Sequence, residues 1–113
     1  MHEMSLCLSM VDLLSERVNV EGAARVLWIG VDVGALGHVE PQALAFCFQS
    51  AARGTPVEGA RLYIRTVPGR AFCFDCGADV MIAQRGDVCP RCGGGALRIE
   101  DGEQLRVTEM EVV

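Results

Sequence analysis

Two segments of the chain have apolar positions at the spacing of a helix. The first covers residues 3–18, and a second helix is expected after Glu40, because Pro41 fits the first helical position. Gly54 and Pro56 favour the end of that helix. The apolar stripes comprise Met4, Leu8, Val11, Leu14 and Val18 in the first helix and Leu44, Phe48 and Ala51 in the second, with Cys7 and Cys47 beside them. We expect both cysteines to be buried as small apolar side chains.

Three other segments alternate between apolar and other positions, as half-buried strands do. They are residues 25–33, 60–67 and 104–112. In the first of them, the odd-numbered positions from Leu27 to Val33 would line one face and Trp28 the other. The elements together predict an α/β (α+β) fold in which two helices cover a three-stranded sheet.

The segment between the last two predicted strands has a different character. Residues 70–98 are rich in Cys, Gly and Asp and lack a long periodic run. Because residues 104–112 return to strand character, this segment is expected to leave the main domain as an insertion. We therefore predict one domain formed by residues 1–69 plus 99–113 and a second formed by residues 70–98.

The insertion carries two cysteine pairs with the spacing of a metal site. Cys73, Cys76, Cys89 and Cys92 form the pattern C-x2-C-x12-C-x2-C. Each pair is followed by a glycine, Gly77 or Gly93, which permits the positive φ that a tight metal-binding turn often needs. Four thiolates are the tetrahedral set that Zn(II) accepts in closed structural sites. The pattern predicts a zinc ribbon and, since no coordination position is left for a substrate, a structural role.

Two other interpretations of the cysteine pairs remain open. They could form two disulfides or be four unrelated core cysteines, although paired cysteines in a reducing compartment more often bind metal. They could instead hold iron, because Cys89-Pro-Arg-Cys92-Gly93 resembles a rubredoxin knuckle. Few aromatic residues surround the segment to bury a redox centre, which favours zinc.

Composition and charge narrow the range of functions. The chain has 113 residues and a net charge of −5, and all ten basic residues are arginine. Proteins that bind nucleic acid usually present a basic face, so nucleic acid is not an expected partner. No apolar run approaches the roughly 20 residues that span a bilayer, and the start of the chain lacks the basic region of a secretory signal. A cytoplasmic location without membrane contact is the expectation.

The amino terminus offers a compact set of nitrogen ligands. The Met1 amine, a backbone amide and the His2 imidazole can chelate one ion, and such ligands suit square-planar nickel or copper. Glu3 adds a carboxylate within reach. The same residues can also be an exposed chain end with an acidic residue at the start of a helix. The residues by themselves favour the second interpretation, because chain ends that could chelate a metal arise often by chance.

The order of these features resembles that of the HypA/HybF family of hydrogenase nickel-incorporation proteins. The start Met1-His2-Glu3, the segment from Gly34 to Pro41, the helix with Ala-Phe-Cys-Phe and the two cysteine pairs carry the resemblance, which covers essentially the whole chain. Gly37 stands where many members are expected to have serine, which concerns the loop geometry alone.

The resemblance implies a nickel metallochaperone for [NiFe]-hydrogenase rather than an enzyme. It implies an Ni(II) site at Met1, His2 and Glu3, with Glu40 as an acidic residue near that site, and Zn(II) at the four paired cysteines. It also implies two partners, a GTPase of hydrogenase maturation and the hydrogenase large subunit precursor. A monomer or a weak homodimer is expected.

Two rival functions remain from the residues alone. One is a zinc-ribbon interaction or adaptor module that transfers no nickel, and the acidic charge disfavours a nucleic-acid version of it. The other is an electron carrier with iron at the four thiolates. His38, which lies close to Glu40 in sequence, is a weaker candidate for a further nickel ligand.

Overall fold

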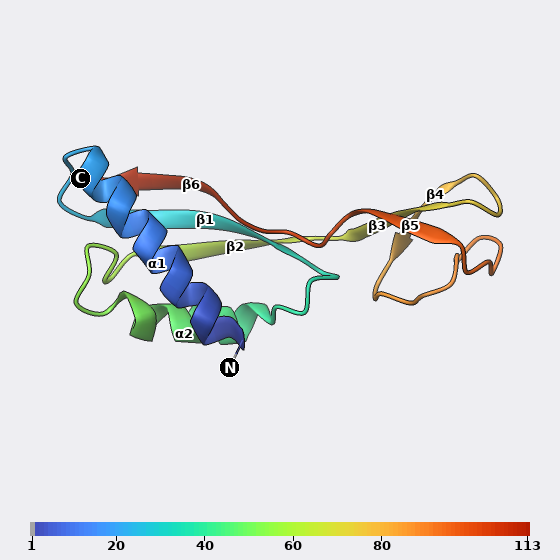
Figure 1. Cartoon of the computed structure of the whole chain (residues 1–113), viewed down its shortest axis with the longest axis horizontal. Coiled ribbons are helices and arrows are strands. Elements are labelled where there is room, and N and C mark those ends of the chain that lie inside the picture. Colours follow the sequence, from blue (N-terminus) through green and yellow to red (C-terminus); the bar gives the residue numbers. More distant parts are fainter. Residues whose placement is uncertain (1) are drawn as a thin grey trace. The chain divides into compact units, whose positions relative to one another are not determined.

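The computed structural model describes residues 2–113, so Met1 lies outside the described residues (Figure 1). The elements are α1 (His2–Val20), β1 (Val26–Gly34), α2 (Pro41–Ala52), β2 (Arg61–Val67), β3 (Gly69–Cys73), β4 (Asp79–Ile82), β5 (Leu97–Asp101) and β6 (Leu105–Val112). The two helices and three of the strands correspond to segments predicted from the apolar pattern. None of the helices in the described part of the chain has the length and apolar character to cross a membrane.

The chain folds into two compact units. The first contains both helices and the adjoining parts of β1, β2 and β6, in residues 2–31, 39–64 and 107–113. The second contains β3, β4 and β5, in residues 32–38 and 65–106. The division of the chain into a nickel-binding domain and a zinc-ribbon domain assigns functions as well as boundaries, and it stays a prediction.

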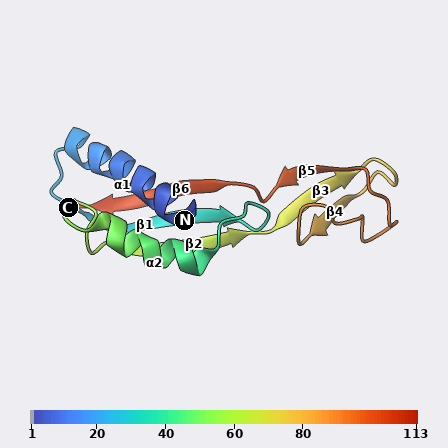
Figure 2. The same ribbon diagram turned by 60° about the horizontal axis from the view of Figure 1, so that its bottom comes forward.

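In the first unit, α1 and α2 pack against each other on one face of the sheet (Figures 1 and 2). Cys7 and Cys47 are 0% and 1% exposed, which confirms that both are buried. Leu8 is 50% exposed, so its place in the predicted stripe was wrong. The buried stripe is centred on Cys7 and Leu14, seven residues apart, and Leu8 lies about 100° around the helix from Cys7.

Backbone hydrogen bonds fix the directions of the strands in the sheet, whose order is β2-β1-β6. The Val26 N–H donates to Pro56 O just before β2, and the Ala35 N–H donates to Val67 O at its end, so β1 and β2 run parallel. The Val113 N–H donates to Arg25 O, so β6 runs antiparallel to β1. A parallel pair needs a crossover connection, and α2 supplies it. β2 and β6 are therefore the edges.

The second unit contains a separate antiparallel sheet of order β4-β3-β5. Its three strands are only four or five residues long, too short to give the periodic signal used in the sequence analysis. Its core comprises Leu36, Ala71, Cys73, Val80, Ile82 and Cys89. Leu36 belongs to the connection between β1 and α2, and its burial in this core was not predicted.

Three backbone segments of the second unit pass one another with no room for side chains. A methyl group on Gly34 would overlap the carbonyl oxygen of Gly102. A methyl group on Gly102, whose φ is +103°, would lie 2.7 Å from Gly69 Cα. This close approach requires glycine, because any Cβ would push the chains apart.

Asp32 joins three strands through a buried carboxylate. It is 2% exposed, and Arg65 donates to both of its oxygens, from Nε at 2.9 Å and from Nη2 at 2.6 Å. Arg106 of β6 lies 3.6 Å from the same carboxylate. The hydrogen bonds from Arg65 lower the pKa of Asp32, and the charge of Arg106 adds to the effect. The sequence analysis did not identify this cluster.

Replacing Asp32 with the uncharged Asp32→Asn should lower the midpoint of thermal unfolding at pH 7 by about 5 °C. The carboxylate of the folded protein has a lowered pKa, so its contribution is complete above about pH 4 and is lost as the pH falls further. The difference between wild type and variant should therefore shrink in acid. Thermal unfolding followed by circular dichroism from pH 7 to pH 2.5 measures it. Asp12→Asn, on the exposed face of α1, is the control, and a difference that does not depend on pH would contradict the argument.

Candidate metal centres

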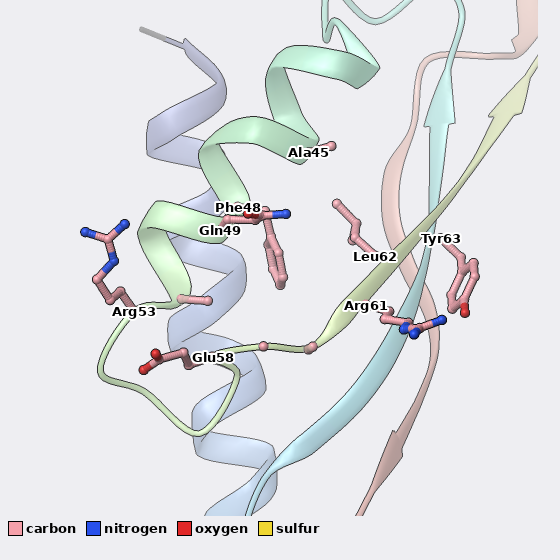
Figure 3. Close-up of a pocket in the computed structure, with 11 residues that line it drawn as sticks. Ala45, Phe48, Gln49, Arg53, Glu58, Arg61, Leu62 and Tyr63 are labelled. Carbon is pink, nitrogen blue, oxygen red and sulfur yellow. The ribbon is translucent and has the colours of Figure 1, made fainter.

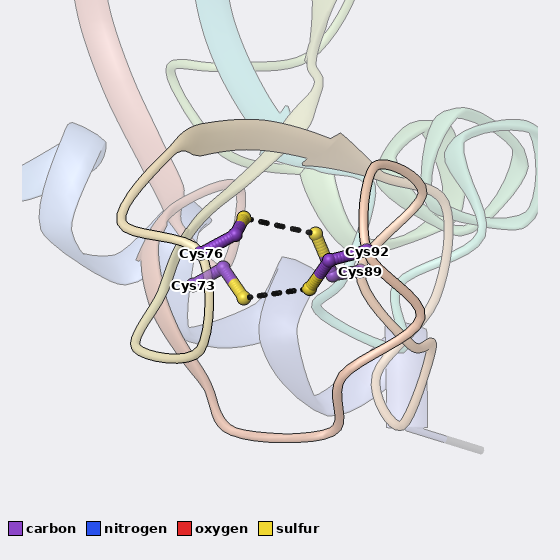
Figure 4. Close-up of side chains that lie close together, drawn as sticks. All are labelled: Cys73, Cys76, Cys89 and Cys92. Carbon is purple, nitrogen blue, oxygen red and sulfur yellow. Dashed lines mark hydrogen bonds between the residues drawn. The ribbon is translucent and has the colours of Figure 1, made fainter.

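Two turns of the second unit bring the paired cysteines together (Figure 4). Cys73 ends β3 and Cys76 lies in the turn that follows, while Cys89 and Cys92 lie in the connection from β4 to β5. All four Sγ atoms lie within 4.8 Å of one another. The Sγ–Sγ distances are 3.6 Å for Cys73 and Cys92 and 3.8 Å for Cys76 and Cys89.

The two turns have the same local geometry. The Gly77 N–H donates to Cys73 O and the Gly93 N–H donates to Cys89 O, each at 2.8 Å. The two glycines have φ values of +73° and +78°, which confirms the positive φ expected after each pair. Each hydrogen bond closes a turn that points two thiols inward, so the sequence C-x2-C-G encodes half of the site.

The sulfur geometry fits a tetrahedral metal ion. Zinc–sulfur bonds of about 2.3 Å in a tetrahedron place the sulfur atoms about 3.8 Å apart, close to the two distances given above. A disulfide needs about 2.05 Å, and all six cysteines are free. Cys73 and Cys89 are buried while Cys76 and Cys92 are exposed. Four thiolates around one centre complete the coordination of Zn(II), so the cluster fits a structural zinc site.

The cluster stabilises one thiolate over the others. Burial raises the pKa of Cys89, but the backbone N–H groups of Cys92 and Arg91 and the neighbouring thiols outweigh burial and lower that pKa to about 7. The backbone N–H of Gly94 lowers the pKa of Cys92, but its thiol neighbours and burial raise it to about 12. The Cys89 thiolate is thus available to a metal near neutral pH, and a bound cation would displace the protons of the other three thiols.

The amino-terminal candidates lie at the start of α1 in the first unit. His2 is exposed, and Glu3 Oε2 accepts the backbone N–H of Glu40 at 3.3 Å. The backbone N–H of Glu3 and then that of Glu40 lower the pKa of the Glu3 carboxyl group. Glu40 Oε2 in turn accepts the Ala43 N–H at 2.7 Å, which makes Glu40 the N-cap of α2.

The structure thus brings Glu3 and Glu40 together and gives both a structural role that the sequence analysis missed. The dipeptide Glu40-Pro41 was the available signal, because proline favours the first helical position and the residue before it is then the N-cap. Over residues 2–113, only the four cysteines form a group of three or more converging His, Cys, Asp or Glu ligands. The predicted Met1 ligand lies outside the described residues. A chelate built from adjacent groups of one chain end needs no such convergence.

His38, the weaker candidate, is exposed on the connection between β1 and α2. Its φ is +48°, a conformation that costs free energy for a residue with a Cβ. Histidine tolerates this region better than most residues. A role for His38 as a nickel ligand stays a prediction.

Known proteins are similar to this chain over almost its entire length. A family described as "Hydrogenase/urease nickel incorporation, metallochaperone, hypA" matches residues 1–112. The chain is 46% identical to a hydrogenase maturation factor HypA of Rhodopseudomonas palustris over 112 residues, which cover 99% of both chains. It is 44% identical to a hydrogenase maturation factor HybF of Klebsiella pneumoniae over 111 residues, which cover 98% of both chains.

Two solved structures share the fold. A solution structure of HypA protein matches with a TM-score of 0.73 and 23% identity, over 100% of this chain and 97% of the other. The solution structure of the Ni metallochaperone HypA from Helicobacter pylori matches with a TM-score of 0.69 and 20% identity, over 98% and 97% of the two chains. The α+β architecture is therefore shared with HypA structures. Together with the match over residues 1–112, this shows that the chain belongs to the HypA family of hydrogenase and urease nickel-incorporation metallochaperones.

Proposed function

We propose that this protein binds Ni(II) as cargo at its amino terminus and delivers it during maturation of [NiFe]-hydrogenase. Membership of the HypA family over residues 1–112 carries the proposal. The ligands would be the Met1 amine, the His2 imidazole and an intervening backbone amide, with the Glu3 carboxylate beside them. Exposure of His2 supports this proposal, because a cargo ion must enter and leave the site.

Glu3 and Glu40 supply negative charge next to the proposed nickel site. The lowered pKa of Glu3 keeps its carboxylate ionised at neutral pH. The backbone N–H of Glu40 holds one oxygen of Glu3, and the Ala43 N–H holds one oxygen of Glu40. Glu40 would therefore act mainly by charge and by fixing the position of Glu3.

The four-cysteine cluster would hold a structural Zn(II). The ligands are Cys73, Cys76, Cys89 and Cys92, and their arrangement leaves no open position for a substrate. In a unit whose sheet has strands of five residues or fewer, the free energy of metal binding becomes free energy of folding. We place the protein among maturation factors rather than enzymes, in line with its family.

The proposal includes partners. Transfer requires that a receiving site bind nickel more tightly than the chain end does, either directly or after a partner changes the state of the site. The hydrogenase large subunit precursor would be the acceptor, and a maturation GTPase would supply the nucleotide chemistry. The proteins would meet in the cytoplasm, with this chain as a monomer or a weak homodimer.

The nickel site predicts a specific result for His2→Ala. Tag-free wild type should bind about one Ni(II) per chain, and the variant should bind at least tenfold more weakly because the chelate loses its imidazole. His38→Ala, which removes the other histidine, should bind like wild type. Calorimetric titration, with zinc content measured in every sample, checks this. Equal binding by wild type and His2→Ala would move the site elsewhere and favour a zinc-ribbon adaptor that carries no nickel.

The zinc site predicts a different pattern for cysteine substitutions. Cys73→Ser should reduce the zinc content from about one per chain to near zero, because three thiolates no longer close the tetrahedron. Amide signals of residues 65–106 should then collapse in a nitrogen–proton correlation spectrum while those of α1 and α2 remain. Cys47→Ala removes a buried thiol outside the cluster and should keep its zinc. Wild-type zinc content in Cys73→Ser would refute the assignment.

A further inference from the structure

The first unit contains an open groove of about 660 Å³ between α2 and β2, which we call the edge groove (Figure 3). Its lining includes Phe48 and Arg53 from the side of α2, and Arg61, Leu62 and Tyr63 from β2. Figure 3 shows α2 on one side of this space and β2 on the other. None of these residues belongs to either metal site.

The groove runs along the outer edge of β2. Figure 3 shows the Leu62 side chain on the side of β2 that faces α2, and the side chains of Arg61 and Tyr63 on the other side of the strand. Residues from both faces of β2 thus line the groove, which opens at the edge of the strand. β2 is the outermost strand of the sheet β2-β1-β6. Within residues 2–113, no backbone group of residues 61–64 has a hydrogen-bond partner outside the sheet. The outward-facing N–H and C=O groups are therefore available to another strand.

The charges beside the edge groove are mostly positive, although the chain as a whole carries −5. Arg53 and Arg61 both line the groove, and no ion pair in the described part of the chain involves either of them. The acid in the lining, Glu58, uses Oε1 to accept the Gly54 N–H at 2.8 Å. At about 0.1 M salt the screening length is about 10 Å, so these neighbouring groups dominate the field at the groove.

The groove also offers apolar surface. Leu62 is half-buried, and Tyr63 is 54% exposed, with its ring edge-on to that of Trp28 at 5.9 Å between centroids. Trp28 donates from Nε1 to Glu111 Oε1 at 3.2 Å, which holds the aromatic pair in place. A bound strand would thus find fixed apolar contacts on either side of its backbone.

We propose that the edge groove binds an extended, acidic segment of a partner protein, which adds to β2 as a fourth strand. Main-chain hydrogen bonds to β2 provide affinity in this mode, and side-chain contacts provide specificity. Carboxylates of the segment pair with Arg53 and Arg61, where an arginine can donate two hydrogen bonds to one carboxylate. A second copy of this chain is the poorer occupant, because its β2 strand carries Arg61 and Arg65 and no acidic residue, so it offers no carboxylate to the arginines of the groove.

The ordinary role of arginine on an edge strand is to prevent strand pairing with other chains. That role predicts that an acidic strand and a basic strand both fail to bind. The proposal predicts that only the acidic strand binds, which makes charge the deciding variable.

The probe is an eight-residue peptide that alternates valine and glutamate, with capped ends, and the control peptide carries lysine in place of glutamate. Both are titrated into isotope-labelled, zinc-loaded, full-length protein at 0.1 M salt. The acidic peptide should shift the amide signals of residues 45–53 and 58–64 and slow hydrogen exchange in β2. The lysine peptide should bind at least tenfold more weakly, and so should an acidic peptide with every second amide N-methylated.

Charge reversals on the protein provide the matched test. Arg53→Glu and Arg61→Glu should each weaken binding of the acidic peptide at least fivefold and strengthen that of the lysine peptide. Arg25→Glu changes an exposed arginine of the same unit outside the groove and should leave both affinities unchanged. Nickel binding and zinc content should be normal in all three variants, which separates this result from the proposed function.

Several outcomes would overturn the proposal. They are the absence of shifts at 2 mM acidic peptide, equal affinity for both peptides, equal loss in Arg25→Glu, and shifts confined to other residues. Shifts of the same amides with protein concentration alone would show that a second copy occupies the groove instead.

Discussion

Hydrogen bonding between β6 and β1 closes the path of the chain through both sheets. The chain leaves the first sheet at the end of β2, builds the second sheet, and must then return to β1. Hydrogen bonds from Gly34 N–H to Gln104 O at 2.7 Å and from Val113 N–H to Arg25 O at 3.0 Å join β6 to β1 from one end to the other. Closing an excursion of about forty residues costs conformational entropy, which these bonds and the bound metal would offset together.

The return of the chain from the second sheet to β1 explains why Gly34 and the buried Asp32 lie near the end of β1. Chain segments that enter and leave the second unit must pass closely, and Gly34 and Gly102 allow that approach. Asp32 then fixes the strands laterally through Arg65 and Arg106. Arg65 ties β2 to Asp32 of β1, and Arg106 ties β6 to the same carboxylate, so the cluster acts on β1, β2 and β6 as a set.

Acidic side chains serve the architecture of the first unit as well. Glu3 accepts a hydrogen bond from the residue that caps α2, so the start of α1 is tied to the start of α2. In the proposed function, the same contact places negative charge beside the chain end that would hold nickel. A metal cargo site of this kind needs exposure for exchange and a fixed neighbourhood for selectivity, and the starts of α1 and α2 would provide that neighbourhood.

Features that depend on local spacing could be predicted from the amino-acid sequence. Helices, the longer strands, the burial of Cys7 and Cys47, and the two C-x2-C-G turns follow from periodicity and from the conformational freedom of glycine. Contacts between residues far apart in the chain depended on the tertiary structure. Leu36 in the second core, Asp32 with its two arginines, and the free edge of β2 depend on strand order and on contacts between residues far apart in the chain. Leu8 shows the limit of predicting burial from helical periodicity, because an apolar residue one position from the centre of a helical stripe can face solvent. The element that packs against the helix determines which of its faces is buried.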